Sequence, residues 1–182
     1  KYLFDITEGA DSLSNIYDFY TGKHNHPKYF DYFSETCKLK QISPVILIFD
    51  NEQSNSNKPI HKFLNRVNDT KRVSDDIKNA HYSHVLKDKN LYLVTHQLRK
   101  GETEGEIESL FTDETLNIEI DGKTFNPNEK TYDGSRNFNK KYFAKYIIHH
   151  YKNINFDGFR PMLDRINSII TESEQIPQST SL

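Results

Sequence analysis

Residues 44–52 have the sequence Pro-Val-Ile-Leu-Ile-Phe-Asp-Asn-Glu, and this stretch decides the fold class of the 182-residue chain. Its apolar part, residues 45–49, is short, rich in β-branched side chains and uninterrupted. Such a run is typical of a parallel strand covered on both faces. A polar, Asn-rich loop follows, and Pro59 is well suited to begin the next helix. A buried strand that leads through a loop into a helix predicts an α/β fold, with residues 45–49 as its central strand.

Shorter signals on both sides of this strand predict the remaining elements. A second buried strand is expected over residues 2–7, ended by a tight turn at Glu8-Gly9. Residues 29–33 fit either a strand or a helical turn. Further strands are expected at 82–86 and 91–95, as a hairpin or an adjacent pair, and on both sides of the turn Asp121-Gly122. Helices are expected after Asp11 or Ser12, after Pro59, over 102–111, over about 139–151 and over about 158–171.

Charge and cysteine content exclude several classes of protein. The chain has 24 basic and 26 acidic residues and a formal net charge of -2. This balance excludes a strongly basic nucleic-acid binder but allows local basic patches. Cys37 is the only cysteine, so an internal disulfide framework and a zinc finger are both excluded. No apolar run approaches the ~18 residues that cross a bilayer, so we expect no membrane contact and a cytoplasmic location.

Aromatic residues compensate for a lean core. The mean hydropathy is -0.81, yet 11 Tyr and 12 Phe supply large buried areas. No repeat or interior linker is visible, which predicts one domain over residues 1–174 and a polar, disordered tail over residues 175–182. The chain begins at Lys1, beside an expected strand and without an initiator Met. We therefore expect it to be part of a longer protein.

Acidic residues follow both of the strongest predicted strands. Glu8 comes directly after residues 2–7, and Asp50 and Glu52 come after residues 45–49. In open α/β sheets, ligands bind beyond the carboxyl ends of the parallel strands, so these carboxylates are expected to converge. Their mutual repulsion would be relieved by Mg²⁺ or Mn²⁺, which prefer oxygen ligands. Such a site predicts metal-assisted phosphodiester hydrolysis, although an acid after a strand is also a common turn or capping residue.

Basic residues supply candidate contacts to nucleic acid. Lys140 and Lys141 begin the helix expected at 139–151 and are placed to contact phosphates. A second group follows the Asp50 loop and is a candidate for tracking a nucleic-acid backbone. It consists of Lys58, Lys62, Arg66, Lys71, Arg72 and Lys78. A solvated helix start is the favoured explanation for Lys140 and Lys141, whereas a solvated helix surface explains the second group equally well.

Two short motifs resemble a known fold. Residues 7–11, Thr-Glu-Gly-Ala-Asp, and residues 48–52, Ile-Phe-Asp-Asn-Glu, look like the two hallmark motifs of Toprim domains, which occur in primases, topoisomerases and the overcoming-lysogenization-defect nucleases. Residues 107–111, Phe143-Ala144 and residues 154–166 resemble the Toprim-like C-terminal extension of some retron reverse transcriptases. The resemblance, which runs from the first of these segments to the last, spans nearly the whole chain.

This resemblance implies a fold and an activity. The fold would be a small, mostly parallel sheet flanked by helices, with hairpin insertions and two C-terminal helices. The activity would be Mg²⁺-dependent cleavage of DNA or RNA by the nuclease effector domain of a retron-type anti-phage system. The domain would be covalently linked to, or associated with, a reverse transcriptase. An alternative of a different class is a regulatory or binding module attached to that polymerase, with acids that bind metal weakly.

The resemblance also assigns roles to individual acids. It makes Glu8 the general acid or base beside the metal, and Asp50 the principal metal ligand. Glu52 occupies the position of a second Asp in the family and is one methylene longer, while Ser54 replaces a frequent Gly. Glu108 would serve a second metal or position the first.

Overall fold

The computed structural model describes residues 10–38, 41, 43–86, 89–128 and 130–175. The chain divides into two compact units, residues 1–107 with 161–182 and residues 108–160. The expected single domain over residues 1–174 stays a prediction, because compact units can belong to one domain. The strand expected at 2–7 and the tail beyond Gln175 lie outside the described residues. The protein is a mixed α/β protein, as predicted.

The first unit contains a three-stranded sheet in the order β1-β3-β2. Its strands are β1 Val45–Phe49, β2 Tyr82–Leu86 and β3 Leu91–Thr95. β1 pairs with β3 in parallel, and β2 pairs with β3 antiparallel, with a register irregularity between His84 and Leu86. The predicted strand at 45–49 and the predicted adjacent pair are confirmed. Among the described strands, however, the central one is β3, whose five residues are all buried, whereas Ile48 of β1 is 40% exposed.

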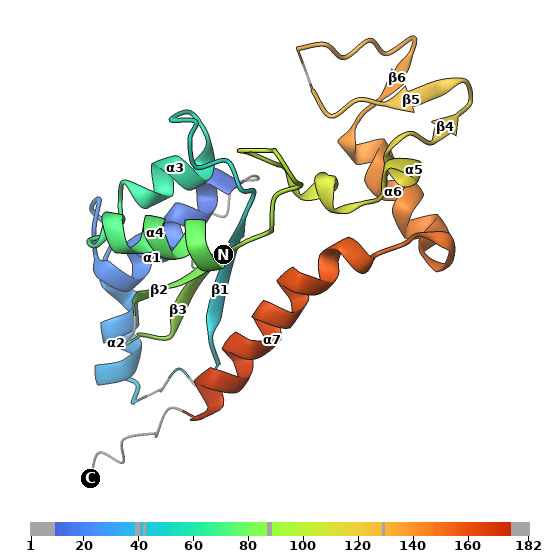
Figure 1. The fold of residues 1–182 in the computed structure, drawn as a ribbon. Coiled ribbons are helices and arrows are strands. Elements are labelled where there is room, and N and C mark those ends of the chain that lie inside the picture. The colour runs from blue at the N-terminus through green and yellow to red at the C-terminus, as the bar shows by residue number, and fades with distance from the viewer. Residues whose placement is uncertain (1–9, 39–40, 42, 87–88, 129, 176–182) are drawn as a thin grey trace. The chain divides into compact units, whose positions relative to one another are not determined.

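Helices cover the sheet of the first unit (Figure 1). They are α1 Leu13–Thr21, α2 Tyr29–Glu35, α3 Pro59–Leu64, α4 Thr70–Ala80 and α7 Arg160–Gln175. Alternate strand residues such as Leu47 and Leu93 join Tyr17, Phe63 and Ile77 of α1, α3 and α4 in one apolar core. α7 lies along the opposite face, where Arg165 Nη1 donates a hydrogen bond to the carbonyl of Thr95 at 3.3 Å. Residues 29–33, open between strand and helix, belong to a helix.

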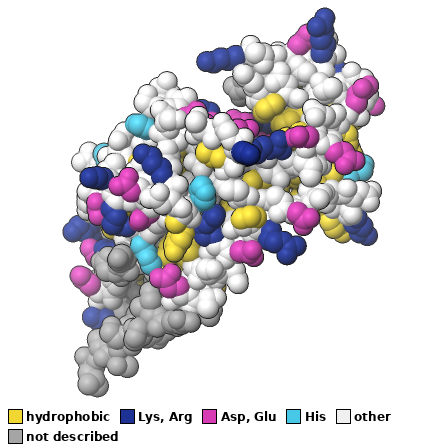
Figure 2. Space-filling view, viewed as in Figure 1, with side chains coloured by type: hydrophobic (Ala, Val, Ile, Leu, Met, Phe, Trp, Pro, Cys, Tyr) yellow, Lys and Arg dark blue, Asp and Glu magenta, His cyan; other side chains and the backbone are white. Residues whose placement is uncertain are grey.

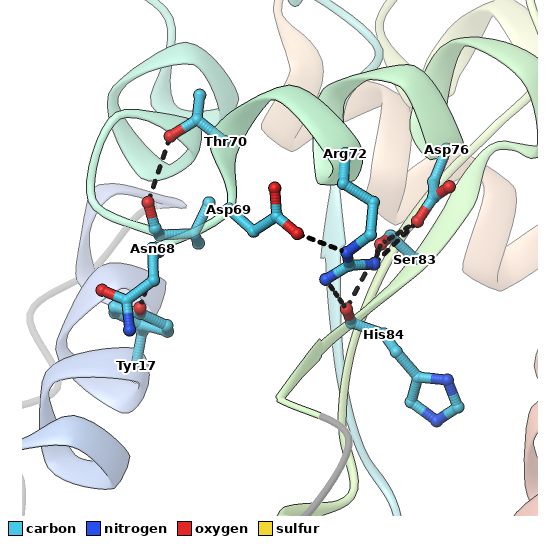
Figure 3. Close-up of polar contacts among 9 residues, drawn as sticks. Tyr17, Asn68, Asp69, Thr70, Arg72, Asp76, Ser83 and His84 are labelled. Carbon is cyan, nitrogen blue, oxygen red and sulfur yellow. Dashed lines mark hydrogen bonds and ion pairs between the residues drawn. The ribbon is translucent and has the colours of Figure 1, made fainter.

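A polar network joins α4 to β2 (Figure 3). The guanidinium of Arg72 lies 2.9 Å from carboxylate oxygens of both Asp69 and Asp76. It also donates to the Ser83 hydroxyl at 3.2 Å and to the carbonyl of His84 at 2.8 Å. Ser83 in turn donates to Asp76 at 2.7 Å. Arg72, one of the basic residues considered for nucleic acid, is therefore engaged in holding the helix to the sheet.

The second unit contains a smaller sheet and one longer helix. Its elements are α5 Asp113–Leu116, β4 Glu119–Ile120, β5 Lys123–Phe125, β6 Asn137–Phe138 and α6 Lys140–His150. The predicted turn at Asp121-Gly122 is confirmed, since both residues have positive φ and β4 pairs antiparallel with β5. Asn139 caps α6 through a hydrogen bond from the Tyr142 N–H at 3.0 Å. The core of the second unit contains several aromatic side chains, and Phe125 is stacked on Phe143.

Two predictions about elements are wrong. The described strands make two parallel and two antiparallel pairings, so the described sheets are mixed rather than mostly parallel. The acidic helix expected over residues 102–111 is reduced to a single 3₁₀ turn, Ile107–Leu110. The physical reason is that the backbone of Gly105 pairs with Asn51 in an antiparallel bridge, which holds this segment extended. None of the helices in the described ranges is long and apolar enough to span a membrane.

Candidate carboxylate site and adjoining cavity

The candidate site lies where the parallel strands β1 and β3 end. Phe49 and Thr95 are paired in register, so the segments that begin at Asp50 and His96 leave the sheet at the same edge. Asn51 and Gly105 exchange two backbone hydrogen bonds of 3.0 and 2.9 Å across this edge. The loop that contains Asp50 and Glu52 is therefore held by the sheet and by a second segment of the chain.

A buried histidine completes this arrangement. His96 is 1% exposed, and its Nε2 lies 3.0 Å from the carbonyl oxygen of Gly105. The side-chain amide of Asn51 donates to the His96 carbonyl at 2.9 Å. His96 was not among the site residues predicted from the sequence. The available signal was its position directly after a buried strand at the same edge as Asp50.

The carboxylates of Asp50 and Glu52 have different surroundings. Asp50 Oδ1 accepts a hydrogen bond from the Ile107 N–H at 2.8 Å. The Glu52 side chain is only 10% exposed, and its Oε1 lies 2.5 Å from Lys58 Nζ. Burial raises the pKa of Glu52, Lys58 opposes that rise, and the negative charges of Asp50 and Glu106 add to it. The charges of two other acids thus act on Glu52 at the end of the sheet, and Lys58 pairs with it.

The donor chemistry at this edge fits a hard divalent cation. Asp50, Glu52 and Glu106 offer carboxylate oxygens, the ligands that Mg²⁺ and Mn²⁺ prefer. Within the described residues, no three His, Cys, Asp or Glu side chains are already arranged as a metal site. Glu8, the further ligand expected from the sequence, lies outside the described residues.

Glu108, Lys140 and Lys141 belong to the second unit. Lys140 Nζ lies 3.5 Å from Glu108 Oε2, so these two predicted residues compensate each other's charge. Lys141 is exposed at the start of α6. Glu108 and Asp50 lie in different units, and the expectation that they serve one site stays a prediction.

A cavity of about 370 Å³ adjoins the carboxylate loop. Asn51, Gln53 and Ser54 contribute one side of it, and residues from α3, α4 and the segment after β3 contribute the remainder. The Ser54 hydroxyl donates a hydrogen bond to the Glu104 carboxylate, so the residue that replaces a family glycine ties the loop to the 98–105 segment. This cavity was not predicted from the sequence.

Acidic and basic side chains are interspersed on the face of the molecule shown in Figure 2. Lys58, the first of the basic residues after the loop, points to Glu52 rather than away from the protein.

No protein-family model matches the chain, and no solved structure matches it significantly.

Proposed function

We propose that the chain is a divalent-cation-dependent phosphodiesterase that acts on nucleic acid, with its reaction centre at Asp50 and Glu52. The observation that supports this proposal most is the position of these acids. They follow a strand that is parallel to its neighbour, at the sheet edge where α/β proteins bind ligands. Glu106 adds a third carboxylate to the same neighbourhood, where its charge raises the pKa of Glu52.

An ionised, buried Glu52 beside other carboxylates destabilises the protein in the absence of a cation. Burial and two like charges disfavour the ionised form of Glu52, and a single Lys58 ammonium opposes them. A protein that retains such an arrangement accepts this cost for a ligand that offsets it. A divalent cation offsets it most directly.

Different residues of the chain would have different roles in hydrolysis. Asp50 and Glu52 would hold the cation through carboxylate oxygens, and the Ile107 N–H fixes the orientation of Asp50. When bound, the cation supplies an activated water and neutralises charge on the phosphate. The ammonium group of Lys58 would leave its ion pair with Glu52 and bind a substrate phosphate instead. In the reaction a water gives up a proton to a base and adds to phosphorus, one P–O bond breaks, and the leaving oxygen takes up a proton from an acid. The role of this base or acid is proposed for Glu8.

The finer assignment follows the resemblance to Toprim domains of retron reverse transcriptases. We propose a Toprim-like fold and an effector role in anti-phage defence, attached to or associated with a reverse transcriptase. Support comes from the Ile48–Glu52 motif, whose acids lie at the carboxyl end of a parallel pair. Lys58, Lys140 and Lys141 are the proposed contacts to nucleic-acid phosphates, and Glu108 is the proposed further acid.

The alternative is a binding module without catalysis. The ion pair between Glu52 and Lys58 favours it, because this carboxylate already has a partner at 2.5 Å. The hydrogen bond from the Ile107 N–H to the Asp50 carboxylate also favours the binding module. On this alternative the acids stabilise the loop, and nucleic acid binds without being cut.

Cleavage of defined substrates separates the two functions. The chain is incubated with single-stranded and duplex DNA and RNA pools in Mn²⁺ or EDTA. We expect cleavage with Mn²⁺ and none with EDTA. The cleavage rate of Asp50→Asn should be lower by several orders of magnitude, because the principal metal ligand is removed.

The matched control is Asp75→Asn, which removes an exposed carboxylate from α4, far along the chain from the loop. This variant should cut as the wild type does. Equal cleavage by Asp50→Asn and wild type would contradict the mechanism, and binding of the pools without any cleavage would favour the binding module.

A further inference from the structure

The cavity beside the carboxylate loop has no role in the hydrolysis described above. Its volume of about 370 Å³ is near the lower end of the range of small-molecule sites. This volume suits a single base or nucleoside better than a longer ligand. Asn51 and Gln53 line it, and they flank Glu52 in the chain. A ligand in the cavity would therefore adjoin the reacting phosphate.

The lining provides hydrogen bonds without negative charge. Amide, hydroxyl and imidazole side chains dominate it, and no Asp or Glu contributes. Lys78 is its single cation, and within the described part of the chain it makes no ion pair. Leu64 and Leu98 add apolar surface. Neutral donors and acceptors beside apolar side chains are the chemistry that recognises the edge and the plane of a nucleobase, whereas a phosphate site would need several cations.

Two histidines line the cavity and differ in how they are held. His61 Nδ1 lies 2.8 Å from the carbonyl oxygen of Gln53, which fixes the orientation of its ring. His81 ends α4 with a positive φ of 60°. Its Nδ1 is buried and has no hydrogen-bond partner among the described residues. A buried polar atom without a partner costs free energy, and a bound ligand can remove that cost.

The charge state of His81 suits the binding of a neutral nucleobase rather than an anion. Burial lowers its pKa, and the nearby Arg165 and His96 lower it further, so the ring is neutral at pH 7. A neutral imidazole has one N–H donor and one acceptor nitrogen. The edges of nucleobases present the same combination of donors and acceptors.

We propose that this cavity holds one unstacked nucleobase of the strand that is cut at Asp50 and Glu52. This inference rests on the proposed function and names its substrate class, a strand with an accessible base. Extruding a base from a duplex costs a few kcal/mol, so single-stranded or unpaired regions should be preferred.

Mononucleotide binding without metal tests the cavity directly. Each ribonucleoside and deoxyribonucleoside 5′-monophosphate is titrated into the chain in EDTA, and amide chemical shifts are followed by NMR. We expect at least one to bind with millimolar affinity or better and to shift residues that line the cavity. Ser74→Leu fills the cavity from α4 and should weaken this binding more than tenfold. Asn79→Leu places the same side chain on an exposed position of α4 and should not.

A second variant guards against misfolding of the first. His81→Asn tolerates the positive φ and removes the imidazole, and it should weaken binding about tenfold, with a melting temperature close to that of the wild type. No binding of any mononucleotide at millimolar concentration would overturn the inference. Wild-type affinity in both Ser74→Leu and His81→Asn would overturn it as well.

The outcome is distinguishable from failure of the proposed hydrolysis. Binding in EDTA does not involve the cation, so Asp50→Asn should still bind mononucleotides, at least as tightly as the wild type, because a negative charge beside the phosphate is removed. Binding by both proteins, with cleavage by neither, would contradict the hydrolysis and support the cavity as a base site. Cleavage by the wild type without mononucleotide binding would contradict the cavity alone.

Discussion

Glu52 is nearly buried beside one cation and two other acids. Burial is the main reason that its pKa lies above the usual value of 4.5. Above that raised pKa, the ionised carboxylate lowers the free energy of unfolding, because the unfolded chain ionises Glu52 more easily than the folded one. As the pH falls through the folded pKa, Glu52 takes up a proton and this penalty disappears.

Replacing Glu52 by Gln should therefore stabilise the protein at neutral and alkaline pH. Gln has nearly the shape of the protonated acid but no charge to bury. The melting temperature of Glu52→Gln should exceed that of the wild type at pH 8, and the difference should vanish below about pH 4.5. Calorimetric melting between pH 4 and pH 8 measures it. A variant that melts lower than the wild type at pH 8 would show that the ion pair with Lys58 outweighs the burial of charge.

At the scale of elements, α4 is held to β2 by the network around Arg72 (Figure 3). The side chain is about one-third exposed, so its ion pairs are partly screened by solvent. Arg72→Met keeps the length of the side chain but removes every one of these hydrogen bonds. We expect a loss of about 1–2 kcal/mol in the free energy of unfolding, or roughly 3–6 °C in melting temperature.

The neighbouring Lys71→Met serves as the control for this prediction. Lys71 is exposed on the same helix, and no ion pair or hydrogen bond links its side chain to another described residue. Its substitution should change the melting temperature by less than about 1 °C. Equal melting of the two variants would mean that the Arg72 network adds nothing to stability.

The elements differ in how well the sequence predicts them. The strand at 45–49 and the turn at Asp121-Gly122 depend on local patterns, and both are confirmed. α4 was not predicted as a separate helix, because Val73 and Ile77 are its only buried apolar residues within a polar segment. The expected helix at 102–111 fails because Gly105 pairs with Asn51, more than fifty residues away in sequence. Long-range pairing of this kind leaves no periodic trace in the sequence.

The candidate site shows the same limit at the scale of the whole molecule. Asp50 and Glu52 could be identified because they directly follow a recognisable strand. His96 follows a recognisable strand in the same way and could also have been identified. Glu106 and the cavity could not, because their approach to the loop depends on the parallel pairing of β1 with β3 and on the bridge to Gly105. The relation between Asp50 and Glu108 is likewise a property of how two units combine, which local patterns do not encode.

Binding of a divalent cation by the carboxylates at the end of β1 is the central claim, and Mn²⁺-dependent melting measures it most directly. At a Mn²⁺ concentration about 100 times Kd, the wild type should gain about 2.7 kcal/mol, or roughly 5–10 °C in melting temperature. Asp50→Asn should lose this gain, and Asp75→Asn should keep it. A wild-type melting temperature that does not respond to Mn²⁺, or an equal response in Asp50→Asn, would contradict the account.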